Sequence, residues 1–280
     1  MTEVHGTNMN NENPLSETPE RRQRVQSAEM GMGVLKALAR LDGMASLTAI
    51  AAEVGESTAK VHRYMSSLSQ EGLVAQDPAT QRYYLAREAI QIGLAALRQC
   101  HPIRLGEGSL LRLRETLQVT CFLAVMGNKG PTILRFEEPG LPVTINVREG
   151  SVLPVLWSAT GQVFLGYLDD ARMRRQAEAE LAQATPEQRA SLRDSDPIAH
   201  LQETVRAEGS AGITDTLLRG ISAVSAPIFD HAGRVCAVLT ALNPASMFDI
   251  RPGGKARLEV VREAHDISAA MGFKGPAGSP

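Results

Sequence analysis

The chain has 280 residues, of which 43% are hydrophobic and 21% charged, and its formal net charge is −2. This composition is ordinary for a globular chain, and it excludes whole-chain disorder, a collagen-like repeat and a disulfide-stapled miniprotein. The longest largely apolar stretch, Ala89–Leu97, is much shorter than the roughly 20 residues of a membrane-spanning helix, and no signal-peptide pattern opens the sequence. The three cysteines are scattered without a CxxC pair, which favours a reducing compartment. We therefore expect a cytoplasmic protein with no membrane contact.

Charge and polarity vary along the chain. Residues 1–20 contain four acids and no Lys or Arg, whereas residues 21–98 contain ten bases and seven acids. A modestly basic segment can bind a polyanion such as a nucleic acid, but a solvated protein surface shows the same charge pattern. The first residues, 1–24, are rich in Asn, Glu, Thr and Pro and predict a disordered tail.

The segment 25–85 predicts three short helices followed by a two-stranded hairpin. Apolar side chains recur in it at helical spacing, and glycines interrupt the pattern. We expect the helices from Ser27 to the stop at Asp42-Gly43, from Ser46 to the stop at Gly55 and from Ser57 to Gln70, and the strands over 73–76 and 82–85. This order is the plan of a winged helix-turn-helix.

The third helix has the pattern of a helix that reads DNA. Its core-facing side carries Val61, Met65 and Leu68, and small, polar and cationic residues cover the opposite side. Small residues allow close approach to the major groove, an Arg can bind guanine bidentately, and other cations suit phosphates. An ordinary amphipathic surface helix shows the same stripe, but the preceding helix and the following hairpin favour DNA binding. The candidate DNA-binding residues are Ser57, Thr58, Ala59, Lys60, His62, Arg63, Ser66 and, on the hairpin, Arg82.

Residues 86–101 predict a linker helix, and residues 102–275 predict a second domain. Strand-like and helix-like stretches are segregated there, which indicates an α+β domain with an antiparallel-rich sheet. We expect helices at 105–117, 158–168, in the charged stretches up to about 209 and at 255–271, and strands at 119–126, 132–138, 143–147, 212–216, 221–229 and 235–242.

Three segments resemble those of a known family, in the family's order. They are AKVHRYMSSLSQEGLVAQDPATQRYYL, VREGSVLPVLWSATGQVFLGYL and RGISAVSAPIFDHAGRVCAVLTALNPAS, and the resemblance covers about residues 25–272. The chain thus resembles the IclR-type bacterial transcription regulators. The resemblance implies a winged helix-turn-helix, a linker helix and an α/β effector-binding domain, assembled as dimers or dimers of dimers. It also implies control of a catabolic operon through a palindromic double-stranded DNA site, where the protein can either recruit or block RNA polymerase.

The family's effector pocket usually holds small carboxylates, and this sequence departs from its usual polar residues. An apolar residue or an alanine replaces the family's His, Cys, one Ser and one acid, at Leu156, Ala223, Leu242 and Ile213. We therefore expect a carboxylic acid effector with an aromatic or otherwise bulky body. Two alternatives remain: Trp157 is only a core residue, or the pocket is too full to bind anything.

Each candidate effector residue has an expected role. Phe122 and Trp157 offer stacking faces, Arg148 is a charge partner, and backbone amides near 159–161 anchor the carboxylate together with neighbouring hydroxyls. The candidate effector-binding residues are Phe122, Arg148, Trp157, Ser158, Ala159, Thr160, Ile213, Asp215, Ala223, Thr240 and Leu242.

No pattern indicates an enzyme, a cofactor or a metal site. The GxSxG, GxxxxGK[ST], HExxH and GxGxxG motifs do not occur, and the six His residues are scattered. A sensor that acts through protein partners without specific DNA binding is the alternative function. It stays open because Thr58-Ala59-Lys60 replaces the Lys-Ser-Thr that usually starts the family's recognition helix. The effector, the operator sequence, activation or repression, and dimer or tetramer are also left open.

Overall fold

A computed structural model describes residues 25–140, 147–192 and 196–275 of the chain. The chain divides into two compact units, with the boundary between Leu97 and Arg98. The tail expected over 1–24 and nearly all of the strand expected over 143–147 lie outside the described residues.

The first unit is a winged helix-turn-helix, as predicted. Its elements are α1 (Gln26–Arg40), β1 (Met44–Ala45), α2 (Leu47–Val54), α3 (Thr58–Gln70), β2 (Val74–Gln76), β3 (Tyr83–Leu85) and all but the last two residues of α4 (Arg87–Gln99). The turn between α2 and α3 depends on Gly55, which ends α2 at φ +72°, a left-handed conformation that glycine adopts without strain. Apolar side chains of α1, α2 and α3 form one core, which includes Leu38, Ile50 and Met65.

The hairpin sheet has three strands instead of the predicted two. The strand order is β1-β3-β2, and both pairs are antiparallel. The extra strand β1 is only two residues long and pairs Met44 with Tyr84 and Ala45 with Tyr83. A pattern of alternating residues cannot show in two residues, so sequence periodicity could not reveal this strand.

Helix α4 has no buried side chain within the described residues. Ile90, Leu94 and Leu97 are all exposed on it. Their spacing of four and three residues places them on one face of the helix.

The second unit is an α+β domain with an antiparallel sheet, as predicted, and the sheet has five strands among the described residues. Its elements are α5 (Pro102–Leu117), β4 (Thr120–Gly127), β5 (Gly130–Glu137), α6 (Ala159–Tyr167), α7 (Ala171–Ala182), α8 (Pro186–Ser191), α9 (Pro197–Glu208), β6 (Ala211–Thr214), β7 (Ile221–Phe229), β8 (Val235–Pro244), the 3-10 turn η1 (Ala245–Met247) and α10 (Lys255–Ala270). The strand order is β5-β4-β8-β7-β6, and every neighbouring pair is antiparallel.

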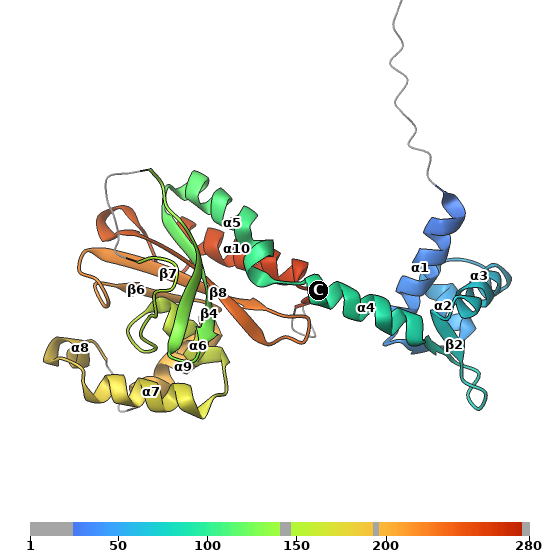
Figure 1. Cartoon of the computed structure of the whole chain (residues 1–280), viewed down its shortest axis with the longest axis horizontal. Helices are drawn as coiled ribbons and strands as arrows, with labels where there is room; N and C mark the ends of the chain where they lie inside the picture. Colours follow the sequence, from blue (N-terminus) through green and yellow to red (C-terminus); the bar gives the residue numbers. More distant parts are fainter. Residues whose placement is uncertain (1–24, 141–146, 193–195, 276–280) are drawn as a thin grey trace, which may run out of the picture. The chain divides into compact units, whose positions relative to one another are not determined.

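Helices cover both faces of this sheet (Figure 1). Helices α5 and α10 pack on one face, and α6 packs on the other beside α9. Alternate side chains of each strand point to opposite faces, so the core has two parts. On β8, for example, Leu239 and Ala241 belong to the part beneath α5 and α10, whereas Leu242 belongs to the part beneath α6.

A buried carboxylate joins α5 to α10. Glu263 is fully buried, and Arg112 donates hydrogen bonds of 2.6–3.2 Å to both of its oxygens. Arg262 donates a further one at 2.8 Å. Burial raises the pKa of Glu263, but hydrogen bonds from Arg112 and Ser109 and the two guanidinium charges lower it more, so the pKa lies below its ordinary value.

Candidate functional site

The exposed side of α3 carries most of the predicted DNA-binding residues. Val61, Met65 and Leu68 are buried, and the opposite side of the helix faces solvent. Its exposed residues include Thr58, Ala59, His62, Arg63 and Ser66. A helix with this division can enter the major groove without losing its own core contacts.

Two of the predicted residues at the start of α3 also have partners inside the protein. The Ser57 hydroxyl caps the helix by accepting a hydrogen bond from the Lys60 amide at 3.4 Å. The Lys60 ammonium forms an ion pair with Glu56 at 2.7 Å. Lys60 must leave Glu56, or share its charge, before it can contact a phosphate.

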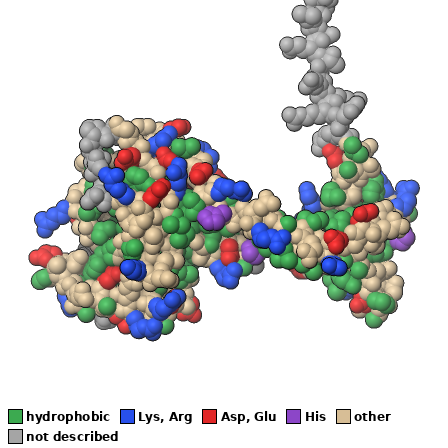
Figure 2. All heavy atoms as spheres, viewed as in Figure 1, with side chains coloured by type: hydrophobic (Ala, Val, Ile, Leu, Met, Phe, Trp, Pro, Cys, Tyr) green, Lys and Arg blue, Asp and Glu red, His purple; other side chains and the backbone are tan. Residues whose placement is uncertain are grey.

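Arg82 lies exposed at the tip of the hairpin between β2 and β3. The Asp77 carboxylate builds this tip by accepting hydrogen bonds from the amides of Ala79 and Thr80 and from the Thr80 hydroxyl, at 2.7–3.0 Å. These bonds, led by that of the Thr80 amide, lower the pKa of Asp77. On the face seen in Figure 2, Lys and Arg side chains are scattered among acidic and uncharged ones, so the case for DNA contact rests on α3 and the hairpin.

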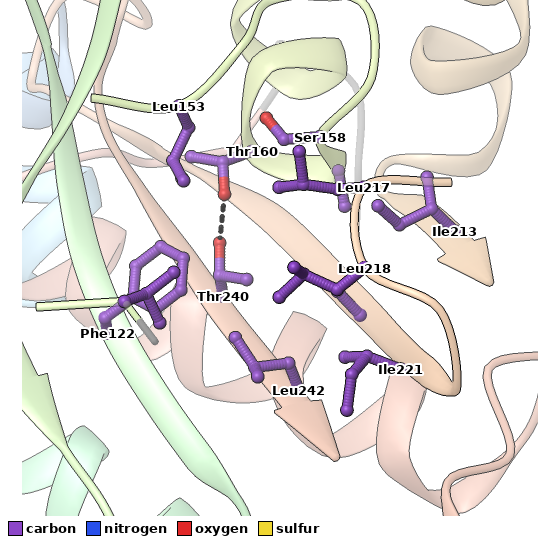
Figure 3. A pocket seen from close by; sticks show the side chains of 13 residues that line it. Phe122, Leu153, Ser158, Thr160, Ile213, Leu217, Leu218, Ile221, Thr240 and Leu242 are labelled. Carbon is purple, nitrogen blue, oxygen red and sulfur yellow. Dashed lines mark hydrogen bonds between the residues drawn. The ribbon is translucent and has the colours of Figure 1, made fainter. Parts of the chain in front are cut away.

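The second unit contains a small apolar pocket between the sheet and the start of α6 (Figure 3). Side chains of β4, β6, β7 and β8, the first turn of α6, the β6–β7 turn and the segment 147–153 surround it. The lining residues are Phe122, Val147, Leu153, Ser158, Ala159, Thr160, Ile213, Leu217, Leu218, Ile221, Ala223, Thr240 and Leu242.

Three hydroxyl groups form a chain at the floor of the pocket. Thr160 and Thr240 point toward one another with their oxygens 2.8 Å apart, and Ser225 lies 2.8 Å from Thr240 (Figure 3 draws the first pair). The strand register explains this, because Thr240 pairs with Ser225 on β7 and with Phe122 on β4. All three hydroxyl residues are buried.

The first turn of α6 forms one wall. The Ser158 hydroxyl donates to the Pro154 carbonyl oxygen at 2.6 Å and accepts from the Gly161 amide at 2.9 Å, so it is used within the protein. Among the described residues, none accepts a hydrogen bond from the amides of Ala159 or Thr160. These two amides, at the positive end of the helix dipole, can bind an anion.

The free space in the pocket is small and uncharged. Its volume is about 40 Å³, and among the described residues that line it only Ser158, Thr160 and Thr240 have polar side chains. A cavity that accepts benzene measures roughly 150 Å³, so an aromatic ligand must displace lining side chains. Leu217 and Leu218 are 38% and 39% exposed, which makes the β6–β7 turn the wall that can move most easily into solvent.

Eight of the eleven predicted effector-binding residues line this pocket, and three do not. Arg148 is exposed. Trp157 is 7% exposed and packs in the hydrophobic core beneath α6. Asp215 has its carboxylate bound to the Gly220 amide, which closes the β6–β7 turn.

Sequence reasoning missed five lining residues. They are Val147, Leu153, Leu217, Leu218 and Ile221. The adjacent leucines 217 and 218 in a turn between two strands were the available signal, because exposed turns seldom carry two large apolar side chains in succession.

Other kinds of site find little support in the described part of the chain. No group of three or more His, Cys, Asp or Glu residues there is arranged to hold a metal ion. Burial raises the pKa of the Cys121 thiol to about 12 and that of Cys236 to about 11, so both are protonated at neutral pH. No described helix is long and apolar enough to cross a membrane.

Comparison with known proteins gives matches over both units. The model of the IclR helix-turn-helix domain matches residues 27–78, and that of the bacterial transcriptional regulator IclR C-terminal domain matches residues 94–269. The crystal structure of Pseudomonas aeruginosa HmgR is 41% identical, covers 90% of this chain and 100% of its own, and superposes with a TM-score of 0.82.

More distant relatives match over similar lengths. The HTH-type transcriptional regulator BhcR of Paracoccus denitrificans is 24% identical over 91% of this chain and 90% of its own. An IclR homologue from Microbacterium hydrocarbonoxydans, crystallised in complex with 4-hydroxybenzoate, shares the fold with 16% identity and a TM-score of 0.50. It covers 88% of this chain and 98% of its own.

Proposed function

The chain belongs to the IclR family of bacterial transcriptional regulators, and we propose that a carboxylic acid with an aromatic or otherwise bulky body controls it. As a member of this family, the protein is a DNA-binding regulator and not an enzyme. The pocket beneath α6 is the site we assign to that acid. A catabolic operon is the target that such an effector suits.

We assign DNA-binding roles to α3 and the hairpin, and a role in dimer formation to α4. The exposed side of α3 reads bases through Arg63, and Arg82 binds phosphate. The apolar face of α4 (Ile90, Leu94 and Leu97) pairs with the same face of a second copy, because three exposed apolar side chains in line are costly in water. A dimer then offers two reading heads to a palindromic site with half-sites roughly 34–36 Å apart. Light scattering on the full chain tests this, and a monomer would contradict it.

The number of protons in the hydroxyl chain indicates which kind of ligand atom the pocket binds. Thr160, Thr240 and Ser225 carry three hydroxyl protons, and the two hydrogen bonds between them use two. Ser225 is fully buried, and among the described residues Thr240 is its only hydrogen-bond partner, so a Ser225 proton that does not point to Thr240 would lack an acceptor at some cost. The favoured arrangement leaves the third proton on Thr160, which faces the pocket. The ligand atom beside Thr160 is therefore a hydrogen-bond acceptor.

The charge and body of the ligand follow from the rest of the lining. The amides of Ala159 and Thr160 lie beside the same hydroxyl and suit the second oxygen of a carboxylate. Phe122, Ile213 and Leu242 present apolar surface around it, which favours an aromatic or bulky body. The Microbacterium relative was crystallised in complex with 4-hydroxybenzoate and shares this fold, which supports an aromatic carboxylate as the class of ligand. Binding requires the Leu217–Leu218 turn to move outward.

The decisive experiment is fluorescence anisotropy of the full chain on DNA from upstream of its own gene, with random duplex as the control. Each titration is repeated with benzoate, 4-hydroxybenzoate and phenylacetate, and with glyoxylate and pyruvate. We expect preference for the upstream DNA and a change in its affinity with an aromatic acid. Tight saturation by the small 2-oxo acids, with no response to aromatic ones, would refute the effector assignment. No preference over random DNA under any condition would instead favour a sensor that acts through protein partners.

A further inference from the structure

A side chain outside the pocket forms hydrogen bonds with the backbone segment that directly precedes the pocket wall. Glu180, on α7, accepts hydrogen bonds from two consecutive backbone amides: Oε1 from Val155 at 2.9 Å and Oε2 from Leu156 at 2.8 Å. Val155 and Leu156 are fully buried, so neither amide is exposed to water while the carboxylate is in place. Their two amides therefore depend on this one side chain.

The residues held by Glu180 determine where the pocket's amides lie. Pro154 accepts the Ser158 hydroxyl, and Leu156 accepts the Gln162 side-chain amide at 3.0 Å. Both bonds join the 154–156 turn to the first turn of α6. The 154–156 turn is thus hydrogen-bonded to Glu180 on one side and to α6 on the other. The position of this turn determines where the amides of Ala159 and Thr160 lie.

Only a carboxylate satisfies this geometry. Two N–H donors need two acceptor atoms in a fork, which an ionised Glu provides and a Gln cannot, because one end of its amide is itself a donor. Gln176, one turn earlier on α7, donates to Oε1 at 3.3 Å and orients the group further. Asp would keep both acceptors on a side chain that is one methylene shorter.

We propose that Glu180 is a positioning residue for the effector site, which sets the anion-binding turn without touching the ligand. This inference rests on the function proposed above, in which that turn binds the effector carboxylate. It predicts that loss of the second acceptor oxygen weakens ligand binding while ligand-free DNA binding is unchanged.

Trp157 provides a fluorescence probe beside the turn that Glu180 binds. It is the single Trp of the chain, it directly follows Leu156, and it is 7% exposed. Its emission therefore reports the packing of the turn, and it reports ligand binding through the effect of the ligand on that turn. Glu178→Gln is the matched control, because Glu178 lies on the same helix, is exposed and, among the described residues, pairs only with Arg174, in a surface ion pair at 3.2 Å.

The experiment compares the full-length wild type with E180Q, E180D and E178Q. Titrating 4-hydroxybenzoate against Trp157 emission should give a dissociation constant about tenfold higher in E180Q, the equivalent of about one hydrogen bond to a charged group. E180D should lie in between, and E178Q should match the wild type. Hydrogen exchange without ligand should show the fastest exchange of the Val155 and Leu156 amides in E180Q, an intermediate rate in E180D and the wild-type rate in E178Q. Thermal unfolding identifies any variant that has simply lost its fold.

The two proposals fail in different ways. If E180Q binds the probe as the wild type does and its 155–156 amides stay protected, the positioning role is overturned. If even the wild type binds no aromatic acid, the proposed effector is wrong. In that case, faster exchange at 155–156 in E180Q still supports the positioning of the turn, and unchanged exchange overturns it.

Discussion

Replacing Arg63 by Ala should remove sequence preference while leaving the fold intact. Arg63 is exposed on α3, and among the described residues no carboxylate forms an ion pair with its side chain. Its loss therefore breaks no internal ion pair and leaves no buried group without a partner. We expect the denaturant midpoint of the variant to equal that of the wild type.

The size of the effect follows from the bond that Arg63 is proposed to make. A bidentate contact with guanine contributes about 1–3 kcal/mol of discrimination, a factor of about 5–150 for each copy. In a dimer on a palindromic site both copies contribute, so the discrimination lost is about 2–6 kcal/mol. Arg82→Ala should behave differently, because a phosphate contact weakens all duplexes alike and its loss reduces the salt slope by about 0.9 for each copy.

The assay is fluorescence anisotropy on upstream and random duplexes at several salt concentrations. Arg40→Ala is the matched control, because Arg40 lies on α1 and pairs with Glu53 at 2.7 Å. We expect Arg63→Ala to bring the two affinities together, Arg82→Ala to lower both, and Arg40→Ala to change neither. An equal loss on both duplexes for Arg63→Ala would refute its base-reading role.

Three further predictions concern the second unit. Gly161→Ala places a Cβ 2.3 Å from the Pro154 carbonyl oxygen, so we expect it to cost about 1–3 kcal/mol of stability in urea unfolding; an unchanged midpoint would contradict this. Ala223→Leu should fill the free volume of about 40 Å³ and abolish the ligand response in anisotropy while ligand-free DNA binding persists, and a retained response would exclude this pocket. The lowered pKa of Glu263 stabilises the fold above the ordinary Glu pKa of about 4.3, and this contribution is lost as the pH falls through the folded-state value. The melting temperature of the wild type should therefore fall more steeply in acid than that of Glu263→Gln, and parallel profiles would show that the carboxylate contributes nothing.

Local patterns in the sequence account for what could be predicted. The buried side of α3 was visible because its apolar residues recur at helical spacing. Thr240 and Leu242 were placed at the pocket by the family resemblance, and both line it because residues two apart on a strand share a face. Both are properties of a single element. The two-residue strand β1 gave no such pattern, because its pairing with β3 depends on residues about forty positions away.

Long-range contacts account for what could not be predicted. Glu180 binds amides 24 and 25 residues earlier in the chain, and no spacing rule marks that bond. Asp215 was grouped with the pocket from the family resemblance, but in this chain its carboxylate binds the Gly220 amide within its own turn. Which polar group a carboxylate meets depends on the folded turn and not on the segment that contains it.

Because side chains alternate between the two faces of the sheet, evolution can change the residues that bind the ligand without changing those that pack beneath α5 and α10. Phe122, Thr240 and Leu242 face the pocket, whereas Leu123 and Leu239 support α5 and α10 from the other face of the same strands. Substitutions at the pocket-facing positions can therefore give the protein a new ligand while the layer of α5 and α10 keeps its packing. Regulators for chemically different nutrients can arise from one such sheet by changing every second residue of its strands.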